Sequence, residues 1–245
     1  MNLQGKKALV TGGNSGIGYA TAKELKAQGA EVIITGRRAD ALKQAAEELD
    51  VTGIVADQGQ LSAIENLAAK VREDFGKIDI LFINAGIVEM AMIETATEAN
   101  YDNMMNINFK GAFFTLSRFI PILNDGASVV FLSSNTASFS GPSSSIYSAS
   151  KAALNSLTKN AAIELAPRKI RVNAVSPGPI ATEIMKKAGF QGEALDQLND
   201  FMITKIPLAK IGDANDIAKM VAYYSSDAAS FITGSEIIID GGMSL

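Results

Sequence analysis

The chain of 245 residues contains no histidine, no cysteine and no tryptophan. Without histidine and cysteine it can have no Ser-His-Asp triad, no cysteine nucleophile, no histidine general base and no disulfide. Zinc sites built on these residues and cysteine-ligated iron–sulfur clusters are excluded too, and we predict no metal site. Any chemistry must therefore use tyrosine, serine, lysine, aspartate or glutamate, or a bound organic cofactor.

Strong positive charge and long apolar runs are also missing. Lys+Arg number 22 against 26 Asp+Glu, which gives a net charge of −4, and basic residues never form a long run. Nucleic acid is therefore not an expected partner. The best apolar stretch, residues 113–123, is interrupted by Arg118 and is shorter than the ~18 residues of a membrane helix. The first residues run directly into a strand-like segment without room for a signal peptide, so we expect a cytoplasmic protein with no membrane partner.

Short apolar runs alternate with longer helix-like segments along the chain. This alternation is typical of a parallel sheet with helices on both faces, and the Val/Ile/Leu/Phe content of the runs suits strands buried on both sides. The expected strands are residues 7–10, 31–35, 53–55, 80–84, 128–132, 171–175 and 236–239. The expected helices are residues 17–28, 39–49, 61–75, 97–123, 146–165 and 214–225.

No linker or internal repeat divides the chain. We therefore predict an α/β protein with a doubly wound, mostly parallel seven-stranded sheet in three α/β/α layers, forming a single domain over residues 1–245. Residues 182–205 look least regular. Because loops after strand ends line the ligand crevice of such sheets, we predict that this segment is a substrate lid.

A glycine-rich segment, residues 11–18, follows the first expected strand and opens the first expected helix. Its glycines would let the backbone approach a pyrophosphate, and the helix N-terminus offers unpaired N–H groups and partial positive charge. The same glycines could simply serve a strand-to-helix connection, but their position after the first strand favours a nucleotide site. The expected cofactor contacts here are Gly12, Asn14, Ser15, Gly16, Ile17 and Gly18.

The segment after the second expected strand carries arginines where an NAD site usually has an acid. Arg37 and Arg38 stand there, and no acid occurs before Asp40. Two guanidinium groups suit a 2′-phosphate, which they can bind through charge-assisted hydrogen bonds, although they could also be solvated surface arginines. Asp57, after the third strand, could accept a hydrogen bond from the adenine amino group or cap a helix.

Tyr147 and Lys151 lie one turn apart on an expected helix, hence on one face. Such a pair alone is weak evidence, because Tyr19 and Lys23 repeat the spacing. Ser134 distinguishes the first pair, since it stands at the carboxyl end of an apolar strand, where ligands bind in these sheets. We expect Tyr19 to be a packing residue.

Together these motifs make the chain resemble the short-chain dehydrogenase/reductase family in its compact form, and the resemblance spans almost the whole sequence. The shared features are Gly12…Gly16-x-Gly18, Asn84-Ala85-Gly86, Asn108, Ser134, Tyr147, Lys151, residues 173–178 and Asp240-Gly241-Gly242. One departure is Ile83, where the family usually has an additional asparagine. The resemblance implies a Rossmann-like fold and hydride transfer between a nicotinamide and a carbonyl or alcohol carbon.

The resemblance also implies a role for each reactive residue. Tyr147 would exchange the proton of the substrate oxygen, and Lys151, together with an oxidised nicotinamide, would favour its phenolate and hold the nicotinamide ribose. Ser134 would hydrogen-bond the substrate oxygen, and Asn108 would anchor a water that leads to solvent. Further cofactor contacts implied in this way are Asn84, Ala85, Gly86, Tyr147, Lys151, Pro177, Gly178, Ile180 and Thr182.

The preferred cofactor follows from two positions. Within the family an arginine at the place of Arg37 usually accompanies NADP(H), whereas the second basic marker is missing because Ser15 stands there. NADP(H) is thus favoured over NAD(H). An NAD(H)-dependent dehydrogenase of the same family and a non-catalytic dinucleotide-sensing protein of the same fold are the alternatives.

The substrate is less defined. The expected pocket wall, residues 87, 88, 135, 137, 139, 142 and 185, is mainly apolar. It suggests a small-molecule carbonyl or alcohol with a partly apolar body. The resemblance further implies a homo-oligomer, either a tetramer or a dimer.

Overall fold

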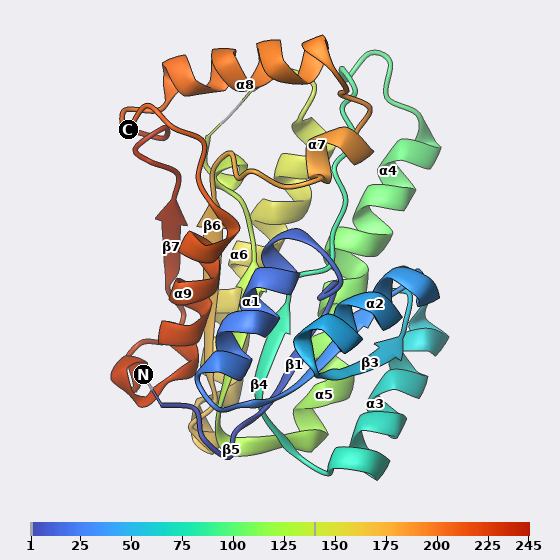
Figure 1. Ribbon diagram of the computed structural model, residues 1–245, viewed down its shortest axis with the longest axis vertical. Coiled ribbons are helices and arrows are strands. Elements are labelled where there is room, and N and C mark those ends of the chain that lie inside the picture. Colours follow the sequence, from blue (N-terminus) through green and yellow to red (C-terminus); the bar gives the residue numbers. More distant parts are fainter. Residues whose placement is uncertain (1, 140) are drawn as a thin grey trace.

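The computed structural model describes residues 2–139 and 141–245 and contains a seven-stranded sheet in the order β3-β2-β1-β4-β5-β6-β7 (Figure 1). All neighbouring strands are parallel, so the predicted sheet is confirmed and is more uniform than the sequence indicated. The strands are β1 (Lys7–Val10), β2 (Glu31–Gly36), β3 (Thr52–Val55), β4 (Ile78–Ile83), β5 (Leu123–Leu132), β6 (Arg171–Pro177) and β7 (Glu236–Ile239).

Helices cover both faces of the sheet. They are α1 (Gly16–Ala27), α2 (Ala39–Leu49), α3 (Leu61–Phe75), α4 (Glu98–Met105), α5 (Ala112–Phe119), α6 (Ser145–Leu165), α7 (Ile184–Lys187), α8 (Glu193–Lys205) and α9 (Ala214–Ser225). Side chains from α1, α2 and α9 form one core with the sheet, and those from α3, α5 and α6 form the other. The three-layer arrangement is therefore confirmed. None of the helices in the described ranges is long and apolar enough to cross a bilayer.

The inner strands contribute side chains to both cores, because successive side chains along a strand point to opposite faces of the sheet. In β5, Val129 and Phe131 enter the core beneath α3, α5 and α6, whereas Val130 enters the core beneath α1 and α9. All three are fully buried. This double burial explains why the buried part of β5 is an apolar run in sequence.

The single helix expected over residues 97–123 is wrong. The structure has α4, a π-helical segment (Asn106–Gly111), α5 and a short 3-10 turn (Ile120–Ile122), and β5 already begins at Leu123. Gly111 lies so close to the loop after β3 that a Cβ atom there would be 2.2 Å from the carbonyl oxygen of Gln58. Pro121 sits in the 3-10 turn, where its missing N–H disfavours a longer helix.

Residues 182–205 are more regular than the sequence indicated. They contain α7 and α8, and α8 runs across one end of the molecule, at the top of Figure 1. None of the residues of α8 is buried, although Leu195, Leu198 and Met202 lie on one face of the helix and are half-buried.

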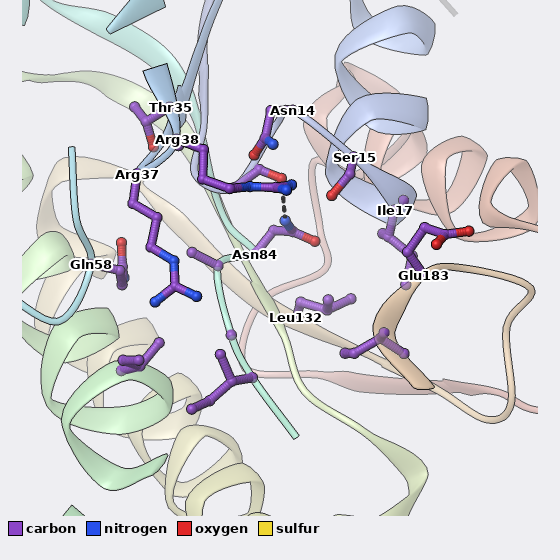
Figure 2. Close-up of a pocket in the computed structure, with 18 of the residues that line it drawn as sticks. Asn14, Ser15, Ile17, Thr35, Arg37, Arg38, Gln58, Asn84, Leu132 and Glu183 are labelled. Atoms are coloured by element: carbon purple, nitrogen blue, oxygen red, sulfur yellow. Dashed lines mark hydrogen bonds between the residues drawn. The ribbon is translucent and has the colours of Figure 1, made fainter. Parts of the chain in front are cut away.

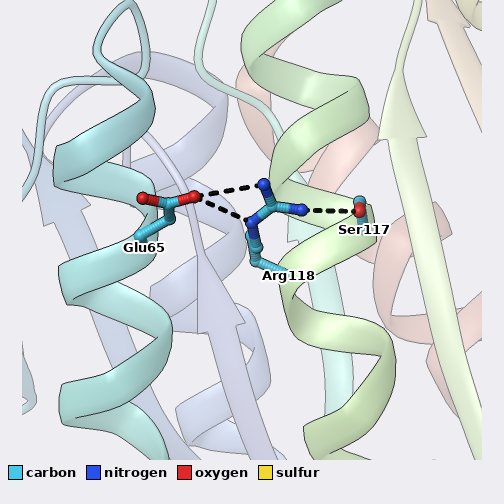
Figure 3. A network of polar contacts seen from close by, with 3 residues as sticks. All are labelled: Glu65, Ser117 and Arg118. Carbon is cyan, nitrogen blue, oxygen red and sulfur yellow. Dashed lines mark hydrogen bonds and ion pairs between the residues drawn. The ribbon is translucent and has the colours of Figure 1, made fainter.

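A polar bridge joins α3 and α5 on the outside of the molecule (Figure 3). The guanidinium of Arg118 donates through Nε and Nη2 to Oε1 of Glu65, both at 3.1 Å, and through Nη1 to the hydroxyl of Ser117 at 3.1 Å. Beneath it the two helices meet through buried apolar side chains such as Leu67 and Leu116. The apolar contact stabilises this pairing far more than the partly exposed ion pair does.

Candidate active site

A cavity of ≈ 320 Å³ opens at the carboxyl ends of the strands, where the strand order reverses between β1 and β4. Parallel sheets of this kind bind ligands at such a switch point. The cavity is lined, partly as Figure 2 shows, by Gly12, Asn14, Ser15, Gly16, Ile17, Thr35, Gly36, Arg37, Arg38, Ala56, Asp57, Gln58, Asn84, Ala85, Gly86, Ile87, Ile107, Leu132, Thr182, Glu183 and Ile184. Twelve of the predicted cofactor contacts are among them.

The glycine loop has a conformation that other residues would strain. Gly12 and Gly16 adopt φ of 65° and 56°, in the left-handed region. A Cβ atom on Gly18 would lie 2.3 Å from the carbonyl oxygen of Gly12, so Gly18 permits the close packing of α1 on the loop without lining the cavity itself. Gly16 faces Thr182 across the cavity mouth, where a Cβ atom would come within 3.3 Å of the threonine methyl group.

Asn84 and Thr11 hold the loops after β1 and β4 together. The Asn84 amide donates to the carbonyl oxygens of Thr11 at 2.8 Å and Gly12 at 3.2 Å. In return, the Thr11 hydroxyl accepts from the backbone N–H groups of Asn84 at 2.9 Å and Ala85 at 3.1 Å. The sequence did not single out Thr11. Ile83, the departure from the family pattern, is buried in the core.

Arginine and carboxamide groups mark one end of the cavity. Arg37 and Arg38 extend from the end of β2, both exposed, and neither has an ion-pair partner within the described residues (Figure 2). Asp57 accepts a hydrogen bond from the backbone N–H of Gly59 at 2.9 Å, so one carboxylate oxygen serves the turn. The side-chain nitrogen of Gln58 is buried without a hydrogen-bond partner. Gln58 was missed from sequence because no motif marks it.

Ser134, Tyr147 and Lys151 come together beside the other end of the cavity. Tyr147 and Lys151 lie on α6, and Ser134 follows β5 and hydrogen-bonds the Tyr147 hydroxyl. The Ser134 hydroxyl also accepts from Thr136, at 3.2 Å from its N–H and 2.9 Å from its hydroxyl. Lys151 donates from Nζ to the carbonyl oxygen of Leu132 at 2.7 Å, and Leu132 lines the cavity.

Burial shifts the pKa values of both ionisable groups. It lowers the pKa of Lys151 from 10.5 to about 8, because the residue is only 3% exposed and burial disfavours its charged form. Burial raises the pKa of Tyr147, and the hydrogen bond from Ser134 opposes that rise. The tyrosine is therefore held as a neutral phenol. This shift is opposite to the phenolate that the family resemblance implies beside an oxidised nicotinamide.

Asn108 lies in the π-helical segment and fixes the chain after β4. Its side-chain oxygen accepts from the N–H of Ile87 at 2.8 Å, and its nitrogen donates to the carbonyl oxygen of Ile87 at 2.9 Å and to the Ser150 hydroxyl at 3.3 Å. The adjacent Gly86 is close to both Asn108 and Lys151, since a Cβ atom there would lie 3.1 Å from Asn108 Oδ1 and 3.6 Å from Lys151 Nζ. The π-helical segment thus places Asn108 close to Lys151.

Several predicted contacts lie outside the cavity lining. Pro177 ends β6, and Gly178 packs against the chain after β7, where a Cβ atom would be 2.5 Å from that of Asp240. Ile180 packs against the core and forms a β-bridge with Gly212. Tyr19 donates to Glu48 at 3.0 Å and packs on the same core, which confirms it as a packing residue.

The residues present fit a nicotinamide dinucleotide. The loop of Gly12 and Gly16 offers backbone without side chains at the N-terminus of α1, which suits a diphosphate. Gln58 has an unpaired amide nitrogen, and Arg37 and Arg38 supply positive charge at the far end. The fold and the cavity together are those of a nucleotide-binding α/β protein, and a buried tyrosine, a serine and a lysine lie beside the cavity.

Comparisons with known proteins identify the family. A family model described as Enoyl-(Acyl carrier protein) reductase matches residues 12–244. The chain is 36% identical to 3-oxoacyl-[acyl-carrier-protein] reductase FabG of Thermotoga maritima over 99% of both chains, and 34% identical to the NADP-dependent (R)-specific alcohol dehydrogenase of Lentilactobacillus kefiri over 98% of this chain and 97% of that one. A short-chain dehydrogenase/reductase from Serratia marcescens superimposes with a TM-score of 0.93 at 32% identity, covering 100% of both chains.

The chain therefore belongs to the short-chain dehydrogenase/reductase family. It is an oxidoreductase, and its family binds a nicotinamide dinucleotide. The family assignment made from the ordered motifs is confirmed.

Proposed function

We propose that the protein is an NADP(H)-dependent oxidoreductase that interconverts a carbonyl and a secondary alcohol, with Tyr147 as the acid and base. The observation that carries this proposal is the grouping of Tyr147, Ser134 and Lys151 at the end of a glycine-cradled cavity. These are proton-transfer and hydrogen-bonding groups, and the sequence supplies no thiol to accompany them, since cysteine is absent. When bound, the reduced nicotinamide supplies the hydride.

The protein's own part in carbonyl reduction is to bind the substrate oxygen and protonate it. Tyr147, held as a neutral phenol by burial, gives its proton to the oxygen as the carbonyl carbon becomes an alcohol carbon. Ser134 hydrogen-bonds the same oxygen and polarises the carbonyl. In alcohol oxidation the phenolate takes the proton back.

Lys151 and Asn108 support this proton transfer. An ammonium group has three N–H donors. One N–H of Lys151 is used by Leu132, which leaves two for the nicotinamide ribose hydroxyls. Asn108 anchors the water that returns a proton to the site, and it holds the loop of Ile87 beside the lysine.

The preference for NADP(H) rests on Arg37 and Arg38. Both line the cavity and have no ion-pair partner in the part of the chain that the structure describes, so they can bind a 2′-phosphate without losing another contact. One relative is named as NADP-dependent. The remaining contacts of the dinucleotide are the predicted ones: the glycine loop, Asp57, Asn84, Ala85, Gly86, Pro177, Gly178, Ile180 and Thr182.

We further propose that residues 182–205 act as a substrate lid. Thr182, Glu183 and Ile184 line the cavity, and α8 continues from them across the end of the molecule.

The substrate is a small molecule with a partly apolar body, in line with relatives named as a 3-oxoacyl reductase and an alcohol dehydrogenase. Self-association is proposed through exposed apolar side chains such as Phe113 on α5 and Ile163 on α6.

A panel of ketones and aldehydes with NADPH tests the proposal. The expected result is substrate-dependent loss of reduced-cofactor absorbance, faster with NADPH than with NADH at equal concentrations. A non-catalytic dinucleotide sensor would bind NADPH and turn over none of the panel. Faster reaction with NADH would support the NAD(H)-dependent alternative instead.

A further inference from the structure

Asp240 directly follows β7 and collects hydrogen bonds from two separate parts of the chain. Its Oδ1 accepts from the N–H of Gly242 at 2.9 Å. Its Oδ2 accepts from the N–H of Ser244 at 2.9 Å, the Ser244 hydroxyl at 2.5 Å and the Asn135 side-chain amide at 3.3 Å. The first three hydrogen bonds, to Gly242 and Ser244, close the C-terminal turn, whereas the fourth joins this turn to Asn135.

The fourth bond reaches the catalytic serine loop. Asn135 follows Ser134 and is 4% exposed, so its amide is fixed inside the protein. Its backbone carbonyl oxygen accepts from the N–H groups of Ser138 at 3.0 Å and Phe139 at 2.8 Å. A shift of Asn135 would therefore move the 3-10 turn (Asn135–Ala137) that Ser134 caps.

The same carboxylate stands against the segment after β6. The N–H of Gly178 donates to the carbonyl oxygen of Ile239 at 2.9 Å. A Cβ atom on Gly178 would lie 2.5 Å from Cβ of Asp240 and 3.5 Å from the Asn135 amide nitrogen. Only glycine at position 178 lets these three segments of the chain approach one another this closely.

The C-terminal turn also holds the chain that leaves α8. The N–H of Leu208 donates to the carbonyl oxygen of Gly241 at 3.1 Å. A Cβ atom on Gly241 would lie 2.6 Å from the Ile206 side chain, and one on Gly242 would lie 3.1 Å from Pro207. Figure 1 shows the C-terminus at the end of the molecule that α8 covers.

The charge state of Asp240 fits this role. Burial raises its pKa and is the largest single influence, but hydrogen bonds from Ser244, Gly242 and Asn135 outweigh it, so the pKa of Asp240 lies below its ordinary value. The carboxylate stays ionised and acts as an acceptor for all four donors.

We propose that Asp240 is a positioning residue that, through Asn135, fixes Ser134 relative to the Gly178 segment and the chain that leaves α8. The inference deepens the proposed function and rests on it, because Ser134 matters to turnover only if the protein is the oxidoreductase described above. Asp240 itself does not touch the reacting atoms.

A double-mutant cycle on kcat tests this coupling. Asp240→Ala and Asn135→Ala should each lower kcat about tenfold, because small displacements of a catalytic group have large effects on rate. The double variant should be no slower than the slower single variant. If the two losses of kcat multiply in the double variant, the proposal is overturned, and unchanged kcat in Asn135→Ala would overturn it too.

Asn135→Ala leaves the three hydrogen bonds of the C-terminal turn intact, so it remains informative if Asp240→Ala folds poorly. Asn160→Ala, which removes an exposed amide on α6, is the matched control and should keep wild-type kcat.

Amide hydrogen exchange gives a readout that does not depend on turnover. Asp240→Ala should raise exchange in residues 133–139 several-fold over the wild type, whereas Asn160→Ala should not. If the wild type reduces no carbonyl and exchange still rises, the proposed function has failed but the coupling stands. Unchanged exchange in residues 133–139 would overturn the coupling whatever the activity.

Discussion

Replacing Lys151 by methionine removes an ammonium group whose burial makes the free energy of unfolding depend on pH. The pKa of Lys151 falls from 10.5 to about 8 on folding. Between these values the unfolded chain binds more protons than the folded protein, so stability rises with pH. For a group with these two pKa values, the linkage between about pH 7 and about pH 9.5 amounts to about 2 kcal/mol. Lys151→Met should lack this increase.

Urea unfolding of the wild type and Lys151→Met across this pH range measures the effect. The difference in unfolding free energy between the two proteins should move by about 2 kcal/mol in favour of the wild type as the pH rises. Lys159→Met, an exposed lysine on the same helix, should follow the wild type at every pH. Parallel curves for the wild type and Lys151→Met would refute the reasoning, because they would mean that folding leaves the pKa of Lys151 unchanged.

Three further substitutions test other parts of the account. In fluorescence titrations, Arg37→Ala should weaken NADPH binding ten- to hundredfold and leave NADH binding unchanged. This loss is equivalent to about 1.5–3 kcal/mol for a charge-assisted contact. Equal losses for both cofactors would contradict the assignment of Arg37 to the 2′-phosphate. Gly18→Ala should lower the unfolding free energy by about 2 kcal/mol, because its Cβ would lie 2.3 Å from the Gly12 carbonyl oxygen, and a silent substitution would contradict that packing. Arg118→Ala should cost less than about 1 kcal/mol in the same assay, since its bond to Glu65 is partly exposed, and a larger loss would give the bridge more weight than we do.

The sheet was predictable from sequence because its strands are buried on both faces. Double burial makes residues 8–10 of β1, 80–83 of β4 and 129–131 of β5 continuously apolar, so the positions of these strands could be predicted from the sequence alone. The glycine loop was predictable because Gly12 and Gly16 have backbone angles that few other residues adopt.

The π-helical segment could not be predicted in the same way. Its last residue, Gly111, lies against the carbonyl oxygen of Gln58, which is far away in sequence, and no local pattern reveals this contact. A helical pattern cannot distinguish an α-turn from a π-turn, so residues 97–123 read as one helix. The helix α8 was missed for a different reason. Its segment is rich in polar residues and none of its residues is buried, although Leu195, Leu198 and Met202 recur at helical spacing.

In the proposed site, the grouping of Ser134, Tyr147 and Lys151 could be predicted, but their hydrogen-bond partners could not. Ser134, Tyr147 and Lys151 belong to spaced motifs in sequence. Thr136, which donates to Ser134, and Leu132, whose carbonyl oxygen holds Lys151, act through hydrogen bonds that leave no sequence pattern.

Turnover of Tyr147→Phe against Tyr19→Phe tests the central claim most directly. The two substitutions remove the same hydroxyl group from the two Tyr-x-x-x-Lys pairs, and Tyr19 only packs on the core and contacts Glu48. With NADPH and a reducible carbonyl, Tyr147→Phe should lose at least about a hundredfold in kcat, as expected for removal of a general acid, while it still binds NADPH. Tyr19→Phe should retain wild-type turnover. Undiminished turnover in Tyr147→Phe would contradict the account.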